Sequence, residues 1–418
     1  MQIYQVLPRL FKSGRFSAFD APTLEWIKGL GFSHIWYTGI PRHSFGKDYV
    51  KGDLGSPYSI IDYYDVNPYL ADSEDERIEE FKQLVSRTHA AGMKVLIDFV
   101  PNHVSPDYSD SHGGIRTLGC CDYDWTDTEK IDYGQRANWD ALAAILDYWC
   151  SLGVDGFRCD MVELVPVDFF HFLTGRIRQS WPDTIFIGEV YNTESYSRYI
   201  SWGGFDYLYD KSGLYDTLRG IVSGQRMCWD ITGNWQRLGG LQPNMLNFLE
   251  NHDEQRLASP WFGGCPQKGY AALAVSALFY PCPFMVYFGQ EIGESAFDGH
   301  EGRTSIFSQA RHIDPTSELT DSQKEVLDRY REVLRLHEEF SDASNFDLCY
   351  FQKGANGFDM RRHFAFMRSG SAGTLLVVCN FSSSPAHIKI EVPCVAPQGF
   401  ADGVEADIAP WDFAIWRK

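Results

Sequence analysis

Short runs of β-branched and aromatic residues alternate with helix-length stretches from the start of the chain to Phe288. This alternation predicts parallel strands joined by crossover helices, and eight such runs favour closure into a (β/α)8 barrel. The expected strands are Ile3–Leu7, His34–Tyr37, Lys94–Val100, Gly156–Asp160, Ile185–Val190, Phe205–Tyr209, Met245–Asn251 and Phe284–Phe288.

The helix before the third strand has the clearest pattern. Four of the five residues Asp72–Glu76 are acidic, and we expect this stretch to be its first turn, because the helix dipole favours negative charge there. Apolar residues then recur at helical spacing, and Gly92 follows as a stop. These apolar residues are Ile78, Phe81, Leu84 and Val85.

The third strand is followed by about 35 irregular residues, 101–136, instead of a helix. We expect a short inserted subdomain there, because a long loop at the carboxyl end of a barrel strand is where function usually lies.

The pattern changes after the eighth strand. Ser322–Phe340 reads as an amphipathic helix, and the residues beyond Ser341 form short alternating runs. The apolar helix face comprises Val326, Leu327, Tyr330, Val333 and Leu334, and the later strands are expected at Leu348–Gln352, Arg362–Met367, Thr374–Cys379, His387–Val392 and Phe413–Trp416. The predicted fold is therefore α/β: a catalytic barrel over 1–341 with 101–136 inserted, and an all-β sandwich over 342–418.

The composition argues against two classes of binding partner. The 418 residues carry a formal net charge of −19, which argues against nucleic acid and anionic membrane surfaces as partners. Aromatic residues make up 15% of the chain, including 12 Trp and 22 Tyr. They fit either a large core or flat surfaces on which sugar rings stack.

No run of 18 apolar residues is present, so no transmembrane helix is expected. Met1–Arg9 reads as a strand and not as a signal peptide. The ten cysteines include no Cys-x-x-Cys pair, and we expect reduced thiols and a cytoplasmic location.

Polar residues close several otherwise apolar strands. Arg158 and Asp160 are two residues apart and point to the same side, so the guanidinium keeps that carboxylate ionised, as a nucleophile requires. Glu189 ends an apolar strand, where burial suits it to protonating a glycosidic oxygen. Asp98 and Phe248–Asp253 end two further strands in polar residues.

Any one of these residues could be a helix cap or half of a structural ion pair. Four acidic strand ends facing one rim are harder to explain that way, because crowded carboxylates repel and a fold tolerates them mostly where chemistry needs them. Two carboxylates flanking a scissile bond are the arrangement for glycoside hydrolysis.

Four motifs occur in the order and on the elements of the α-amylase family, glycoside hydrolase family 13, which the chain resembles over essentially its whole length. They are Asp98–His103, Gly156–Asp160, Ile187–Glu189 and Asn251–Asp253, with lesser matches at Ser56–Tyr63, Tyr287–Glu291 and Gly302–Thr304.

The resemblance implies catalytic roles for three residues. Asp160 would be the nucleophile, Glu189 the general acid/base, and Asp253 the residue that holds the hydroxyls of the distorted sugar. It also implies substrate contacts, in which Arg158 positions the nucleophile and Tyr191 lines the acceptor side or only packs. The remaining substrate-binding candidates are Tyr58, which would stack on the ring, Asp98, and the two histidines His103 and His252.

The chain departs from the family pattern at three places. Ser59 follows Tyr58 where many exo-acting, oligosaccharide-cleaving members carry Asp. Met161-Val-Glu163 follows the nucleophile where α-amylases commonly have Lys-His. The loop after the third strand is short for this family, although Asn102 matches a family calcium ligand. The other ligands would be Asp107, Asp110, Asp122 and Asp124, which could equally be solvated. A structural calcium ion is thus possible, and the chemistry itself requires no cofactor.

The sequence therefore predicts a retaining α-glycoside hydrolase that acts on α-glucans or malto-oligosaccharides through a covalent β-glycosyl-enzyme. A transglycosylase or sugar isomerase with the same site is the alternative, and a non-catalytic carbohydrate-binding relative is a third. The expected partner is an α-glucan or oligosaccharide, and the oligomeric state stays open.

Overall fold

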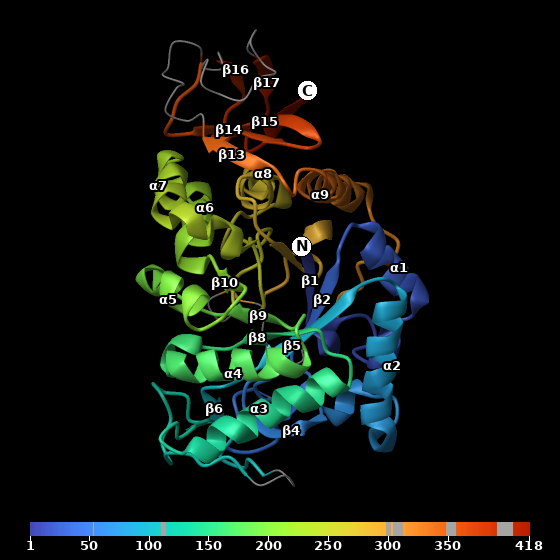
Figure 1. The fold of residues 1–418 in the computed structure, drawn as a ribbon. Helices are drawn as coiled ribbons and strands as arrows, with labels where there is room; N and C mark the ends of the chain where they lie inside the picture. Colours follow the sequence, from blue (N-terminus) through green and yellow to red (C-terminus); the bar gives the residue numbers. More distant parts are fainter. Residues whose placement is uncertain (53, 110–113, 298–301, 304–311, 348–356, 391–403) are drawn as a thin grey trace. The chain divides into compact units, whose positions relative to one another are not determined.

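The computed structural model describes residues 1–418 except 53, 110–113, 298–301, 304–311, 348–356 and 391–403. Eight strands form a closed barrel in the order β1-β12-β11-β10-β9-β8-β5-β2, which confirms the predicted fold class (Figure 1). Their bounds are β1 (Gln2–Val6), β2 (His34–Tyr37), β5 (Lys94–Phe99), β8 (Gly156–Cys159), β9 (Ile185–Gly188), β10 (Tyr207–Tyr209), β11 (Met245–Phe248) and β12 (Phe284–Tyr287).

Several strands end earlier than predicted. Asp160, Glu189 and Asn251 were expected within strands, but β8, β9 and β11 stop before them. Asp160 and Glu189 each keep one backbone hydrogen bond to the neighbouring strand, at 2.9 and 3.1 Å, so they lie immediately beyond the last residue of the ladder.

The chain divides into two compact units, which we describe separately. The N-terminal unit comprises Ile3–Tyr209 and Thr304–Ser317, and the C-terminal unit comprises Met1–Gln2, Asp210–Arg303 and Glu318–Lys418. The boundary predicted at residue 341, between catalytic and sandwich domains, stays a prediction.

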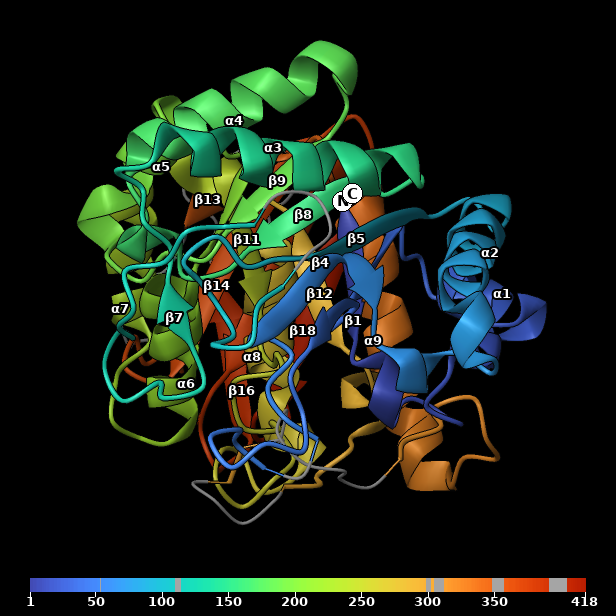
Figure 2. The same cartoon turned by 90° about the horizontal axis from the view of Figure 1, so that it is seen from below.

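In the N-terminal unit, neighbouring parallel strands pair in register, with Asp98 of β5 opposite Arg158 of β8 and Cys159 of β8 opposite Gly188 of β9. Helices α3 and α4 lie side by side in both views (Figures 1 and 2). The helices of this unit are α1 (Ala21–Gly29), α2 (Arg77–Ala90), α3 (Arg136–Ser151), α4 (Val167–Ser180) and α5 (Tyr196–Ser201).

Helix α2 begins at Arg77, five residues later than expected. The carboxylate of Glu80 accepts hydrogen bonds from the backbone N–H groups of Asp72 and Ser73 at 2.8 and 2.7 Å, which holds these two residues in a turn outside the helix. Three of the four predicted apolar residues are buried, and Ile78 is half-buried.

The segment after β5 contains a short ladder that the sequence did not reveal. Strands β6 (His103–Val104) and β7 (Glu129–Lys130) pair antiparallel, with His103 opposite Lys130. A second unpredicted antiparallel pair, β3 (Pro41–His43) and β4 (Ile60–Val66), follows β2. Strands β3, β6 and β7 have only two or three residues, which show too little alternation to be recognised in a sequence. The seven residues of β4, IIDYYDV, do not alternate strictly between apolar and polar.

The C-terminal unit contains β11, β12 and four helices: α6 (Asp216–Val222), α7 (Trp229–Leu238), α8 (Tyr270–Leu278) and α9 (Asp321–Glu339). Helix α9 confirms the predicted amphipathic helix, and all five predicted apolar residues are buried. It starts with a capping box, in which the Thr320 side chain accepts from the Gln323 N–H and the Gln323 side chain accepts from the Thr320 N–H.

The terminal region forms two antiparallel sheets, as predicted. One has the order β13-β14-β15-β18 and the other pairs β16 with β17, while α8 packs against β15 (Figure 1). The bounds are β13 (Ser344–Asp347), β14 (His363–Gly370), β15 (Gly373–Asn380), β16 (Ala386–Ile390), β17 (Val404–Ile408) and β18 (Phe413–Arg417). Strands β13 and β17 were not predicted, and the strand expected at 348–352 lies outside the described residues.

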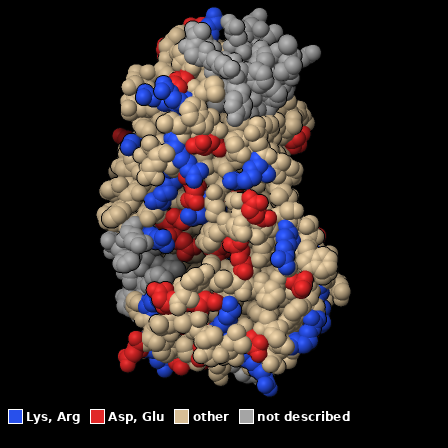
Figure 3. Space-filling view, turned by 90° about the vertical axis from the view of Figure 1, so that its left-hand side faces the viewer, with Lys and Arg blue, Asp and Glu red and all other residues tan. Residues whose placement is uncertain are grey.

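Acidic and basic side chains are interspersed on the face drawn in Figure 3, so the excess of acidic residues does not form a single-sign patch there. Among the described residues, no helix has the length and apolar character needed to cross a membrane. The eight cysteines in the described ranges are all free thiols.

Candidate active site

Four charged residues meet at the carboxyl ends of three adjacent strands in the N-terminal unit. Asp98 lies in β5, Arg158 in β8, and Asp160 and Glu189 come directly after β8 and β9. Asp160 donates its N–H to the Phe99 carbonyl and Glu189 donates its N–H to the Cys159 carbonyl, so the first residue beyond each strand is still fixed by the neighbouring strand.

The guanidinium of Arg158 lies among three carboxylates. Its nitrogens are 2.7 Å from Asp160 Oδ1, 2.9 Å from Glu189 Oε1 and 3.5 Å from Asp98 Oδ1, and the side chain is fully buried. Burial alone would lower the pKa of Arg158, but the surrounding carboxylates and tyrosines outweigh it and raise the pKa well above its usual value. Arg158 is therefore a permanent cation at the centre of the cluster.

Both carboxylate oxygens of Glu189 accept hydrogen bonds, in addition to the Arg158 contact. Met161 donates its backbone N–H to Oε2 at 2.8 Å, and Tyr191 donates its hydroxyl to Oε1 at 2.6 Å. Tyr191, which we predicted to line the acceptor side, is thus in direct contact with the candidate acid/base.

Asp98 is enclosed by donors. Tyr58 donates its hydroxyl to Oδ1 at 3.1 Å, and Trp36 and the Gly39 N–H donate to Oδ2 at 3.2 and 3.1 Å. Burial raises the pKa of Asp98 to about 6, against the opposing charge of Arg158. Trp36 was not predicted as a site residue, although it lies in the strand that precedes the motif with Tyr58, and that position could have indicated a role in the site.

His103 is buried beside Trp125, with ring centroids 5.7 Å apart, and its Nδ1 lies 3.2 Å from Asn102 Nδ2. Burial lowers the pKa of His103 to about 4, so the imidazole is neutral at pH 7. Trp125 is a second aromatic residue that sequence reasoning missed, because nothing in its loop distinguishes it from a packing residue.

The remaining two site candidates lie in the C-terminal unit, just after β11. Asn251 Oδ1 accepts the backbone N–H groups of Asp253 and Glu254, both at 2.9 Å, and this turn presents the Asp253 side chain with 29% of its surface exposed. His252 Nε2 lies 3.2 Å from Asp253 Oδ2, and the His252 side chain is fully buried.

The residues expected to bind calcium do not form an oxygen cage. Lys130 Nζ lies 2.8 Å from Asp122 Oδ1, Asn102 Nδ2 donates to Asp122 Oδ2 at 2.9 Å, and Asp107 pairs with Lys47 at 3.3 Å. Buried Asn102 Oδ1 accepts no hydrogen bond from the described residues, and the structural calcium ion stays a prediction. No described group of three or more His, Cys, Asp or Glu could hold a metal, and Asp110 lies outside the described ranges.

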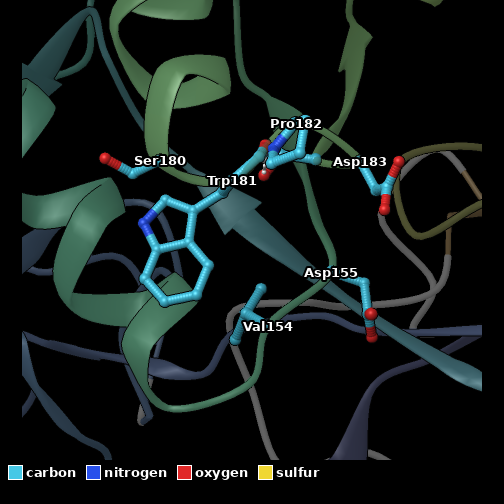
Figure 4. Close-up of a pocket in the computed structure, with 7 residues that line it drawn as sticks. Val154, Asp155, Ser180, Trp181, Pro182 and Asp183 are labelled. Carbon is cyan, nitrogen blue, oxygen red and sulfur yellow. Dashed lines mark hydrogen bonds between the residues drawn. The ribbon is translucent and has the colours of Figure 1, made fainter.

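A pocket elsewhere in the N-terminal unit is lined by Val154, Asp155 and residues 180–184 (Figure 4). Its residues come directly before β8 and β9, whereas Asp160 and Glu189 come directly after them. The pocket therefore belongs to the opposite end of these strands. Trp181 lines it, and its indole N–H donates to Asp147 at 2.7 Å.

Comparison with known proteins finds similarity to α-amylases and related enzymes. A family model described as "Alpha amylase, catalytic domain" matches residues 21–125. The α-amylase 2 of Dictyoglomus thermophilum is 26% identical over 341 residues, which cover 75% of this chain and 56% of that protein. Neopullulanase 2 of Thermoactinomyces vulgaris is 22% identical over 442 residues, which cover 94% of this chain and 71% of that protein.

The chain is thus similar to members of the α-amylase family, in sequence and in fold. Its fold agrees with solved structures of α-amylases. A maltogenic α-amylase from Thermotoga neapolitana superimposes with a TM-score of 0.74 at 22% identity, over 100% of this chain and 96% of the other. The α-amylase of Geobacillus thermoleovorans, solved with acarbose, gives a TM-score of 0.76 at 19% identity, over 99% of this chain and 97% of the other.

The chain spans little more than half the length of several curated relatives that it matches. The matches span 56% of D. thermophilum α-amylase 2 and 56% of the α-amylase of Haloarcula japonica. The similarity to solved structures therefore supports the barrel fold, while activity and substrate need an argument from the site itself.

Proposed function

We propose that the protein is a retaining α-glycoside hydrolase that acts on α-glucans or malto-oligosaccharides. The observation that carries the proposal is the pair Asp160 and Glu189, which follow adjacent strands and share the Arg158 guanidinium at 2.7 and 2.9 Å. A nucleophile and an acid/base on neighbouring strand ends are what the two-step reaction needs.

In the first step, the Asp160 carboxylate attacks the anomeric carbon of the sugar. The bond from that carbon to the leaving oxygen breaks, and the proton of the Glu189 carboxylic acid passes to this oxygen. The product is a β-glycosyl ester on Asp160. Arg158 keeps Asp160 ionised and oriented for the attack, because its guanidinium donates to Oδ1.

In the second step, water replaces the departed sugar. The Glu189 carboxylate takes a proton from the water, the water oxygen bonds to the anomeric carbon, and the ester bond to Asp160 breaks. Two inversions give net retention of the α configuration. No metal or other cofactor takes part in either step.

The proposal assigns the other site residues to substrate binding. Asp253 would hold ring hydroxyls as the sugar distorts, together with His252 beside it. His103 is neutral at pH 7, so its imidazole can both donate to and accept from hydroxyls. Tyr58, anchored by Asp98, would offer its ring for stacking. The substrate class is supported by the names of relatives, which include cyclomaltodextrinase and neopullulanase.

A second candidate is α-glucan transglycosylation, in which a sugar hydroxyl takes the place of water. One relative, an α-1,4-glucan:maltose-1-phosphate maltosyltransferase of Cereibacter sphaeroides, is 27% identical over 238 residues. Both candidates share the first step. Incubation with maltotriose separates them, because hydrolysis gives glucose and maltose whereas transfer gives longer oligosaccharides with little free glucose.

The direct test replaces the two catalytic carboxylates. We expect Asp160→Asn and Glu189→Gln each to lower kcat on maltotriose by several orders of magnitude, with circular dichroism spectra unchanged. Asp183→Asn, at an exposed position before β9, is the matched control and should keep normal turnover. Near-normal kcat in either site variant would disprove the assignment.

The stereochemical prediction is independent of mutagenesis. We expect proton NMR of freshly released product to show the α-anomer first, followed by mutarotation to the equilibrium mixture. Initial appearance of the β-anomer would instead indicate an inverting site and would contradict a nucleophilic Asp160.

A further inference from the structure

The two segments that carry the proposed nucleophile and acid/base are joined by crossed hydrogen bonds. Glu189, after β9, accepts the backbone N–H of Met161, after β8, at 2.8 Å. In the opposite direction Glu163, on the β8 side, accepts the backbone N–H groups of Tyr191 at 2.8 Å and Asn192 at 3.1 Å. Each segment therefore supplies a carboxylate to the backbone of the other.

Tyr191 links these crossed contacts to the reactive group. Its backbone is held by Glu163, and its hydroxyl donates to Glu189 Oε1 at 2.6 Å. The two oxygens of Glu189 thus accept from two different places, Oε1 from Tyr191 and Oε2 from Met161. Hydrogen bonds to both oxygens fix the plane of the carboxyl group as well as its position.

The backbone at Met161 is shaped for this arrangement. Met161 has φ 43° and ψ 45°, a left-handed conformation that costs a non-glycine residue about 1 kcal/mol or more. This conformation ends the extended course of the chain after β8, and the 3-10 turn Val162–Leu164, which includes Glu163, begins at the next residue. Buried Val162 anchors this turn, and Tyr199 donates its hydroxyl to the Val162 carbonyl at 3.3 Å.

We infer that Glu163 and Tyr191 are positioning residues that aim the Glu189 carboxyl group at the leaving oxygen. The inference rests on the proposed function. Tyr191 acts on Glu189 directly, and Glu163 acts through the Tyr191–Asn192 backbone. These two residues raise the rate by helping Glu189 to transfer its proton. Their effect is therefore large for a leaving group that must be protonated and small for one that departs without a proton. A residue that only stabilises the fold would affect all substrates alike.

The test compares substrates whose leaving groups differ in this need. We measure kcat/KM of the wild-type chain, Glu163→Gln and Tyr191→Phe on maltotriose and on α-maltosyl fluoride, whose fluoride departs with little help from an acid. The amide introduced by Glu163→Gln keeps one acceptor oxygen but turns an NH2 group toward the other backbone N–H, and Tyr191→Phe removes only the hydroxyl.

We expect both variants to lose about 10- to 100-fold in kcat/KM on maltotriose, a part of what general acid catalysis contributes, and less than about threefold on the fluoride. Glu194→Gln, an exposed residue of the same segment, should match the wild type on both substrates. Tyr191→Phe decides the matter if Glu163→Gln fails to fold.

Equal losses on both substrates, or no loss on maltotriose, would overturn the positioning role while leaving the proposed hydrolase intact. A wild-type chain that turns over neither maltotriose nor α-maltosyl fluoride would overturn the proposed function itself, and the inference with it.

Discussion

Individual side chains at the site are fixed by charge neutralisation. Three carboxylates surround Arg158, and the buried guanidinium offsets their mutual repulsion. The two-residue spacing of Arg158 and Asp160 predicted their contact, because alternate residues of a strand face the same side. The contact from Arg158 to Glu189 depends on strand neighbours that are 31 positions apart along the chain, so no local pattern could reveal it.

Lys130 provides a prediction at the same scale. We propose that its ammonium group neutralises Asp122 in place of a calcium ion, since the two atoms are 2.8 Å apart in a partly buried setting. The melting temperature should therefore be the same in EDTA and in millimolar calcium. Lys130→Met should lower the free energy of unfolding by about 1 kcal/mol, measured by urea denaturation.

Lys82→Met, in the exposed pair with Glu79, is the matched control for Lys130→Met and should change stability little. A rise of several degrees in melting temperature on adding calcium would show that the loop binds the ion despite Lys130.

At the scale of elements, strand positions follow from apolar runs, but their ends do not. The runs at 156–160 and 185–190 located β8 and β9, while the turn at Met161 and the Glu163 contact arise only when the two strands are neighbours. The predicted start of α2 was wrong for a similar reason, because Glu80 draws Asp72 and Ser73 out of the helix.

The segment after β11 is held by a buried ion pair, which gives a prediction for this element. Glu250 lies 3.0 Å from Arg256 and accepts the Leu257 N–H at 2.7 Å, and burial raises the pKa of Glu250 to about 7. Glu250→Ala leaves the buried Arg256 without this carboxylate. We expect a loss of about 3 to 5 kcal/mol in the free energy of unfolding, measured at pH 8, where Glu250 is ionised.

Asp328→Ala removes an exposed partner of Arg331 on α9 and serves as the control, with an expected change below about 0.5 kcal/mol. If Glu250→Ala were as mild as this control, the ion pair would not be what holds the segment that carries His252 and Asp253.

For the whole molecule, buried titratable groups determine how stability depends on pH. Burial lowers the pKa of five histidines: to about 4 for His34, His43 and His103, to about 3 for His337, and below its usual value for His363. Between pH 6.5 and these values the unfolded chain binds more protons than the folded chain, so acid destabilises the fold. Burial raises the pKa of Asp98 to about 6 and of Glu250 to about 7, and these two groups act in the opposite direction.

Counting only these six most strongly shifted groups, four histidines against two carboxyl groups leave a net difference of about two protons near pH 5.5. Burial also raises the pKa of Asp127, Asp206 and Glu254, which act with Asp98 and Glu250. We therefore expect the free energy of unfolding to fall by about 2 to 3 kcal/mol as the pH drops by one unit near pH 5.5, measured by urea denaturation. His337→Gln should reduce this slope by about 1 kcal/mol per pH unit. In the folded chain, His337 Nε2 lies beside the Cys282 carbonyl and Nδ1 lies beside the Gln2 amide nitrogen. A proton on Nδ1 would therefore point at another hydrogen-bond donor, which opposes protonation of the ring.

His171→Gln, at an exposed residue, should leave the slope unchanged. A stability that is flat or rising between pH 6.5 and 5 would show that the buried histidines are not the dominant titrating groups of the fold.

The sequence by itself determined the barrel, because apolar periodicity and helix signals are local, and it determined the candidate carboxylates, because motifs at strand ends are local too. Only the tertiary structure decided which groups touch. Arg158 reaches Glu189, Lys130 reaches Asp122, and Glu163 reaches the backbone at Tyr191. Parallel neighbours in a barrel are joined through long crossover connections, so contacts between their ends have no counterpart in the spacing of residues along the chain.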